Sequence, residues 1–129
     1  MVAALLFVFL AALEPAPSDW TSLAEVEEVQ VLSENEDASP EETTVWLAVV
    51  AGQGFIRTGD TSWYPNLVRK PDIGVRVSGK EYAVRAELIE EPGLRGKVIA
   101  EFRRKYGWSD VFVDWVFPGD GHVLRLAPR

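Results

Sequence analysis

Alternating apolar and polar positions occupy much of the chain after Trp20 and predict a protein built mostly of β-strands. Residues 25–32 (EVEEVQVL) alternate imperfectly, and residues 43–50 (TTVWLAVV) form a longer, apolar-rich run. The segment between them, 33–42 (SENEDASPEE), consists of polar residues and turn formers. A period of two is typical of a half-buried strand, and clusters of turn formers separate strands. The pattern predicts a first β-hairpin with a polar loop at 33–42.

The middle of the chain predicts a third strand, a short helix and a second hairpin. A tight AGQG connection leads into residues 55–58 (FIRT). The more polar segment 62–71 (SWYPNLVRKP) predicts a short helix with Ser62 as its N-cap. Residues 73–90 alternate on both sides of Ser78–Gly79, which is the pattern of a β-hairpin with a tight turn.

The last third predicts one amphipathic helix and a final strand. In residues 92–107 (PGLRGKVIAEFRRKYG) apolar side chains recur every fourth residue from Leu94 to Tyr106, and a glycine lies just past the last of them. The tail 122–129 (HVLRLAPR) predicts a strand, and Trp46 is expected to fill the core. These elements predict a mainly β (α+β) fold, a six-stranded antiparallel split β-barrel with one main helix and one short helix.

The N-terminus carries an uninterrupted apolar run at residues 2–13 (VAALLFVFLAAL). Twelve residues are few for a membrane-spanning helix but suit the core of a signal peptide, although the usual basic flank is missing. We therefore divide the chain into an apolar segment at 1–18 and a barrel domain at 19–129. If cleavage follows Ser18, the protein is exported, to the periplasm or outside the cell. A retained anchor or a helix docked on the barrel are the alternatives. Without a signal the protein is cytoplasmic, and membrane contact would involve only residues 2–13.

Composition excludes several classes of function. The chain has no cysteine and one histidine, so a disulfide scaffold, a thiol nucleophile and a zinc site are not expected. The first 56 residues hold ten acidic residues and no Lys or Arg, whereas the remainder holds thirteen basic and ten acidic residues. No concentrated basic block exists that could neutralise the phosphates of a nucleic acid, but a local pocket for one small anion remains an option.

The segment after the third predicted strand gathers the residues that suit an anion. A guanidinium at Arg57 can hold phosphate bidentately, hydroxyls at Thr58 and Ser62 can donate to it, and a helix start adds backbone N–H groups. The Trp63-Tyr64 pair could stack on a planar ring, but aromatic side chains beside a barrel more often fill the core or an interface.

Other residues of chemical interest are given ordinary structural roles. The amide of Asn66 is expected to bond to nearby backbone, and His122 is expected to be a surface residue at a strand end. The aromatic segment 112–121 (FVDWVFPGDG) is expected to form a dimer contact.

The order of these motifs resembles a known superfamily. The stretch TTVWLAVVAGQGFIRTGDTSWYPNLVRKPDIGVRVSGKEYAVRAELI, followed by EFRRKYGW and LRLAPR, resembles the split-barrel flavin-binding superfamily of pyridoxamine 5′-phosphate oxidase. Within it, Ser62-Trp63-Tyr64 with Asn66-Leu67 is similar to the deazaflavin-dependent nitroreductase-like group. Trp46, RKYG and LRLAPR are similar to an uncharacterised group of short split-barrel proteins. The resemblance covers about residues 20–129.

The resemblance implies a homodimer that holds the phosphate of FMN or a deazaflavin at the subunit interface, next to the strand and short helix described above. Trp63 stands where the oxidases commonly carry Lys, so the chain departs from the oxidase pattern there. The residues expected to bind the cofactor are Arg57, Thr58, Ser62, Trp63, Asn66 and Lys70.

Two functions remain open at this point. The first is a flavin- or deazaflavin-binding split barrel that acts as an oxidoreductase, transferring hydride to a small electrophilic substrate. The second is a cofactor-free split barrel used for binding or assembly. The sequence assigns no catalytic residue, and whether the protein is an enzyme depends on which of the two holds.

Overall fold

The structure, a computed structural model, describes residues 13–59, 63–107 and 121–129. Its strands are β1 (Glu14–Pro15), β2 (Glu28–Glu34), β3 (Pro40–Val50), β4 (Gln53–Thr58), β5 (Asp72–Val77), β6 (Lys80–Leu88) and β7 (His122–Pro128). Its helices are a 3-10 turn, η1 (Thr21–Leu23), and two α-helices, α2 (Tyr64–Arg69) and α3 (Pro92–Tyr106).

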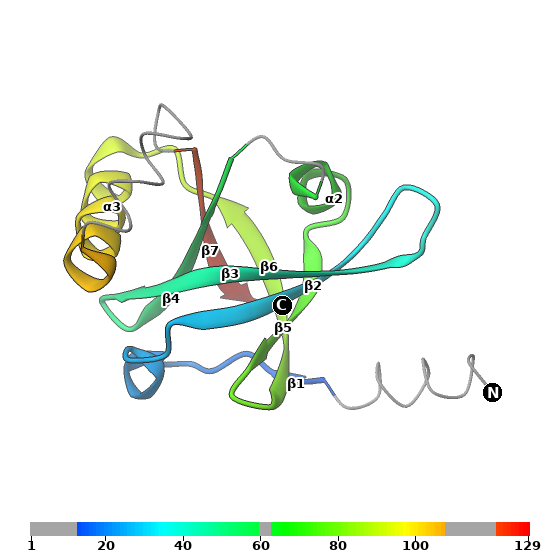
Figure 1. Ribbon diagram of the computed structural model, residues 1–129, viewed down its shortest axis with the longest axis horizontal. Coiled ribbons are helices and arrows are strands. Elements are labelled where there is room, and N and C mark those ends of the chain that lie inside the picture. Colours follow the sequence, from blue (N-terminus) through cyan, green and yellow to red (C-terminus); the bar gives the residue numbers. More distant parts are fainter. Residues whose placement is uncertain (1–12, 60–62, 108–120) are drawn as a thin grey trace.

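Six of these strands close into one barrel (Figure 1). The sheet order is β1-β6-β5-β2-β3-β4-β7, and an additional pairing of β6 with β7 closes it. All pairs among β2 to β7 are antiparallel, whereas the two-residue β1 pairs in parallel with β6. The predicted six-stranded antiparallel barrel with one main and one short helix is confirmed, and β1 is an addition that the sequence did not indicate.

The first hairpin differs from the prediction because its strands continue into the polar segment. The β2–β3 ladder extends to the pair Glu34↔Pro40, which leaves a connection much shorter than the predicted loop. Salt bridges offset the charge repulsion there, since Glu34 pairs with Lys70 and Glu42 pairs with Arg76. Such pairing removes part of the repulsion that would otherwise favour an extended polar loop.

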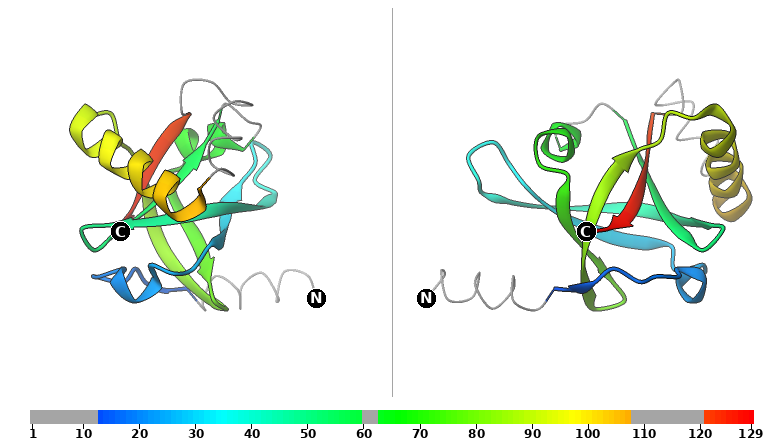
Figure 2. Two further views of the ribbon diagram at one scale, coloured as in Figure 1. Left: turned by 60° about the vertical axis from the view of Figure 1, so that its left-hand side comes forward. Right: turned by 180° about the vertical axis from the view of Figure 1, so that it is seen from behind.

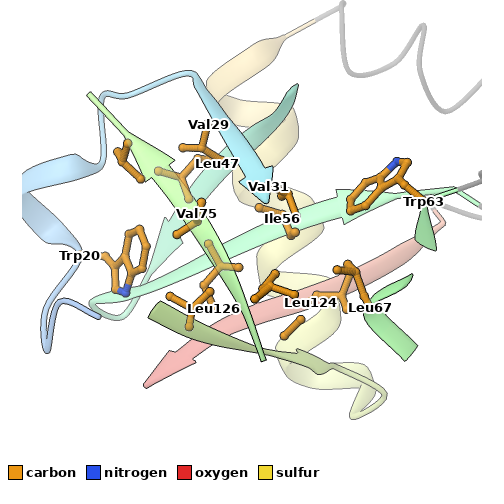
Figure 3. Close-up of a cluster of buried hydrophobic side chains, with 14 residues drawn as sticks. Trp20, Val29, Val31, Leu47, Ile56, Trp63, Leu67, Val75, Leu124 and Leu126 are labelled. Atoms are coloured by element: carbon orange, nitrogen blue, oxygen red, sulfur yellow. The ribbon is translucent and has the colours of Figure 1, made fainter. Parts of the chain in front are cut away.

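The interior of the barrel forms the first core and is closed at each end by a tryptophan. Trp20 and Trp63 lie at opposite ends of the cluster drawn in Figure 3, with the apolar side chains of the strands between them. Trp20 is only 2% exposed, and a Cβ added to Gly54 would lie 2.7 Å from its indole ring. The absence of a side chain at Gly54 therefore makes room for Trp20, and residue 54 cannot be enlarged without moving that ring.

A second core, here called the outer core to distinguish it from the barrel core, lies outside the barrel, where α3 covers β3, β4 and β7 (Figure 2). The predicted apolar face of α3 supplies the fully buried Val98 and Phe102. Trp46 belongs here and is only half-buried, stacked on Tyr106 with ring centroids 4.3 Å apart and planes within 5°. Trp46 was expected to fill the core, but it lies on the outer face of β3, at the edge of this second cluster and only partly buried.

Both ends of α3 are fixed by specific hydrogen bonds. The Glu91 carboxylate caps the N-terminus by accepting from the N–H groups of Gly93 and Leu94, at 2.8 and 2.7 Å, and these bonds lower its pKa. At the C-terminus the Tyr106 hydroxyl lies 2.6 Å from the Leu47 carbonyl oxygen. The Lys105 ammonium donates to the same oxygen at 2.8 Å. Desolvation lowers the pKa of Lys105 in this half-buried place.

We predict that Tyr106→Phe lowers the free energy of unfolding by about 1–2 kcal/mol. The substitution keeps the ring stacked on Trp46 but removes the hydroxyl that bonds the main chain of Leu47 and Glu27. Urea denaturation of the variant and the parent, compared at equal slope, measures the loss. An unchanged midpoint would mean that the hydroxyl contributes nothing to the attachment of α3.

The segment before the barrel domain takes part in the sheet. Glu14 and Pro15 pair with Tyr82 and Ala83, and Ala16 packs against the first core. Cleavage after Ser18 remains a prediction. It would remove these contacts and leave a mature chain that begins at Asp19. None of the described helices is long and apolar enough to cross a membrane.

Candidate functional site

One end of the barrel collects polar and aromatic side chains from three elements: the end of β4, the start of β7 and helix α2. The last pair of the β4–β7 ladder is Thr58↔His122. Gly121 precedes this pair with a φ of +67°, and a Cβ there would lie 2.4 Å from the Thr58 carbonyl oxygen. Only glycine fits so close to another backbone segment, so the chain enters β7 at a fixed position.

Arg57 and Thr58 lie on opposite faces of the barrel wall. Arg57 faces α3, where its guanidinium lies 5.5 Å from the centroid of the Phe102 ring. Thr58 is buried, and its hydroxyl donates to the Gly59 carbonyl at 3.1 Å. Because successive residues of a strand point to opposite faces, a single ligand can reach both side chains only across the end of β4.

Trp63 and Tyr64, at the start of α2, have different surroundings. Trp63 is 8% exposed and belongs to the barrel core, as the packing interpretation of the Trp63-Tyr64 pair predicted. Tyr64 instead stacks on His122, with ring centroids 4.0 Å apart and planes within 2°. Both rings of this pair are half-buried. The Tyr64–His122 pair therefore joins α2 to the start of β7.

Asn66 and Lys70 attach α2 to the β2–β3 hairpin. The Asn66 side chain is 3% exposed, and its amide nitrogen donates to the side-chain oxygen Oδ1 of Asn35 at 3.1 Å. Its own oxygen accepts from Arg69 at 2.7 Å, so the bonds are made with side chains rather than with nearby backbone as expected. Lys70 is exposed and pairs with Glu34. Both side chains thus have structural partners away from Arg57.

The structure accordingly brings together only some of the six predicted cofactor residues. Arg57 and Thr58 flank the end of β4, Trp63 is packed in the core, and Asn66 and Lys70 are engaged with the hairpin. Ser62 lies outside the described residues, as does nearly all of the aromatic segment 112–121.

His122 is the residue of this site that the sequence interpretation missed. It was expected to be a surface residue at a strand end. It does open β7, opposite Thr58, but it is half-buried and stacks on Tyr64. Only strand register and the position of α2 bring Tyr64 and His122 together, and neither can be read from local sequence. Among the described residues no group of three His, Asp or Glu side chains is placed to hold a metal ion.

The arrangement offers a cation, a hydroxyl and a pair of flat rings around one strand end. A guanidinium can bind an anionic group, while aromatic faces can hold a planar one. These are the elements that a phosphorylated planar ligand needs. No acid and base are brought together among the described site residues in a way that would define a hydrolytic centre.

Several solved structures share this fold. A conserved hypothetical protein of Mycobacterium tuberculosis, Rv2991, is 19% identical over 92% of this chain and 84% of its own, with a TM-score of 0.66. The heme storage protein HutZ of Vibrio cholerae is 15% identical, with coverages of 81% and 83% and a TM-score of 0.68. A putative pyridoxamine 5′-phosphate oxidase of Listeria innocua (17%, coverages 84% and 91%, TM-score 0.58) and an F420 reductase (13%, coverages 88% and 95%, TM-score 0.57) are also similar.

These similarities define the class: the chain is a split barrel of the type found in pyridoxamine 5′-phosphate oxidase-like proteins. Residues 19–117 match the family described as an uncharacterized protein conserved in bacteria, DUF2255, and the chain belongs to that family. A search among curated proteins found no match.

Proposed function

We propose that this protein binds a phosphate-bearing flavin or deazaflavin across the end of β4 and acts as an oxidoreductase with that cofactor. The observation that carries the proposal is the placement of Arg57, a half-buried cation at the end of a barrel strand. Its guanidinium lies over the aromatic face of Phe102, which holds the positive charge in position beside the strand end. Fold neighbours named as an oxidase and as an F420 reductase support the choice of ligand class.

The described residues fit such a cofactor in part. Arg57 suits the phosphate, and the hydroxyl of Thr58 lies on the other side of the same strand end. Trp63 does not suit ring stacking because it is enclosed in the core, and Lys70 is paired with Glu34. When bound, a flavin or deazaflavin supplies hydride-transfer chemistry, while the protein supplies binding, orientation and exclusion of water. The proposed oligomer is a homodimer.

Arg57→Ala should weaken the binding of FMN or a deazaflavin about 10- to 100-fold, because a charge-assisted hydrogen bond to phosphate is lost. Fluorescence titration measures the affinity, and native mass spectrometry of the same samples reports cofactor and subunit stoichiometry. Arg57→Lys should fall between the parent and the alanine variant, since it keeps the charge without the fork of donors.

A matched control is available on β7, the strand that pairs with β4. Arg125 of β7 pairs with Glu87 and lies in register with Phe55, two residues before Arg57 on β4. Arg125→Ala removes the same charge and should leave cofactor affinity unchanged. Equal affinity in the Arg57→Ala variant and the parent would count against phosphate binding by Arg57.

A cofactor-free role in binding or assembly is the second candidate. It is favoured by the structural engagement of Trp63, Asn66 and Lys70, three residues that a cofactor was expected to contact. Under this alternative the purified protein carries no chromophore, and neither FMN nor a deazaflavin raises its melting temperature. A ligand-dependent rise would instead support the cofactor-binding proposal.

A further inference from the structure

We infer that the Tyr64–His122 pair is the ring-binding element of this site, with His122 contacting the flat ring system of the ligand. The inference rests on the proposed function and adds to it the residues that would hold the planar part of the cofactor. Of the Trp63-Tyr64 pair that the sequence suggested for stacking, it keeps Tyr64, which is half-buried against the edge of the barrel core, and replaces the enclosed Trp63 by His122.

The pair is held from both sides by rigid structure. His122 opens β7 in register with Thr58, directly after Gly121, whose φ of +67° and close approach to the Thr58 carbonyl leave little freedom. Tyr64 opens α2 directly after Trp63, which is anchored in the barrel core. A stacking surface formed this way is preorganised, so little conformational entropy is lost when a ligand binds to it.

The Asn66 contacts fix the position of α2 and hence of Tyr64. Asn66 is buried and bonded to Asn35 and to Arg69, so the helix is tied to the β2–β3 hairpin close to the pair. This gives Asn66 a positioning role in place of the direct cofactor contact expected from the sequence. Its side-chain amide stabilises the position of the helix.

The chemistry of the pair suits a flat heteroaromatic ring better than an aliphatic or metal ligand. The two parallel rings cover one face of each other, and their outer faces can take a further flat ring in offset stacking. A ligand lying across the end of β4 can contact Arg57 on the α3 side and His122 on the other, because Arg57 and Thr58 are adjacent and Thr58 pairs with His122. The pair thereby gives the ring a place distinct from that of the phosphate.

The test uses the full chain with FMN and a deazaflavin as probes. His122→Ala should lower affinity about 10-fold, because the stacking ring is lost, and His122→Phe should lower it less, because a flat ring remains. Tyr64→Leu should also weaken binding. Tyr82→Leu is the control, since Tyr82 is a half-buried tyrosine at the Trp20 end of the same barrel and should not affect affinity.

A second readout does not depend on any variant folding. His122 is the only histidine of the chain, so its imidazole proton signals in an NMR spectrum of the native protein need no assignment by mutation. Ring stacking should shift these signals as either probe is titrated to saturation. Equal affinity of parent and His122→Ala, or imidazole signals that do not move at saturation, would overturn the inference while leaving phosphate binding at Arg57 intact. If the parent binds neither probe, the proposed function fails and the inference fails with it.

Discussion

Replacing Trp20 with alanine should lower the free energy of unfolding by about 3–5 kcal/mol, the range measured for large aromatic residues removed from a core. Trp20 is 2% exposed, closes the end of the barrel opposite α2, and contacts Tyr82 with ring centroids 6.3 Å apart. Gly54 makes room for the indole ring, because a Cβ there would lie 2.7 Å from it. The main-chain N–H of Trp20 donates to the Gly52 carbonyl at 2.9 Å and holds the backbone in place beside that ring.

Trp46→Ala is the matched control, because it removes the same side chain from a half-buried place on the outer face of β3. It should cost about 1–2 kcal/mol, mostly through the loss of stacking on Tyr106. Chemical denaturation at equal slope compares the two variants. If Trp46→Ala proved the more destabilising of the two, the division of the structure into a barrel core and an outer core would be wrong.

Phe102→Ala should be the second large effect, with a loss of about 3–5 kcal/mol. Phe102 is fully buried between α3 and the barrel and also supports the Arg57 guanidinium, 5.5 Å from its ring centroid. Its removal should therefore leave a cavity in the outer core and also free Arg57 to move. Under the proposed function the variant should bind FMN or a deazaflavin more weakly than the parent.

Phe102→Leu separates these two roles. A leucine fills most of the volume, so the stability loss should be under about 1.5 kcal/mol, but it offers Arg57 no aromatic face. The expected result is a nearly normal denaturation midpoint with reduced cofactor affinity. Unchanged affinity in this variant would show that the ring does not position the guanidinium for binding.

Much of the fold was predictable because its signals are local. The alternation around Ser78–Gly79 and the spacing from Leu94 to Tyr106 each place apolar residues on one face, and the structure buries those faces. The length of the first hairpin was not predictable in the same way. Its strands extend through acidic residues because Lys70 and Arg76, which are distant in sequence, supply the opposite charges.

The site was harder to predict for a related reason. That Arg57 and Thr58 face opposite sides follows from strand periodicity alone and could have been deduced. Trp63 is buried whereas Tyr64 and His122 are half-buried, and this difference depends on how α2 is oriented at the barrel end. Helices this short carry little periodic signal, so tertiary packing decides which side chains point inward.

The central claim is that a flavin-type cofactor binds across the end of β4 with its phosphate at Arg57. Equilibrium titration of the full chain with FMN and with a deazaflavin, in parallel for the parent, Arg57→Ala and Arg125→Ala, tests it most directly. We expect saturable binding of one probe by the parent and by Arg125→Ala, and binding about 10- to 100-fold weaker by Arg57→Ala. Absence of saturable binding by the parent, or the same affinity in all three proteins, would contradict it.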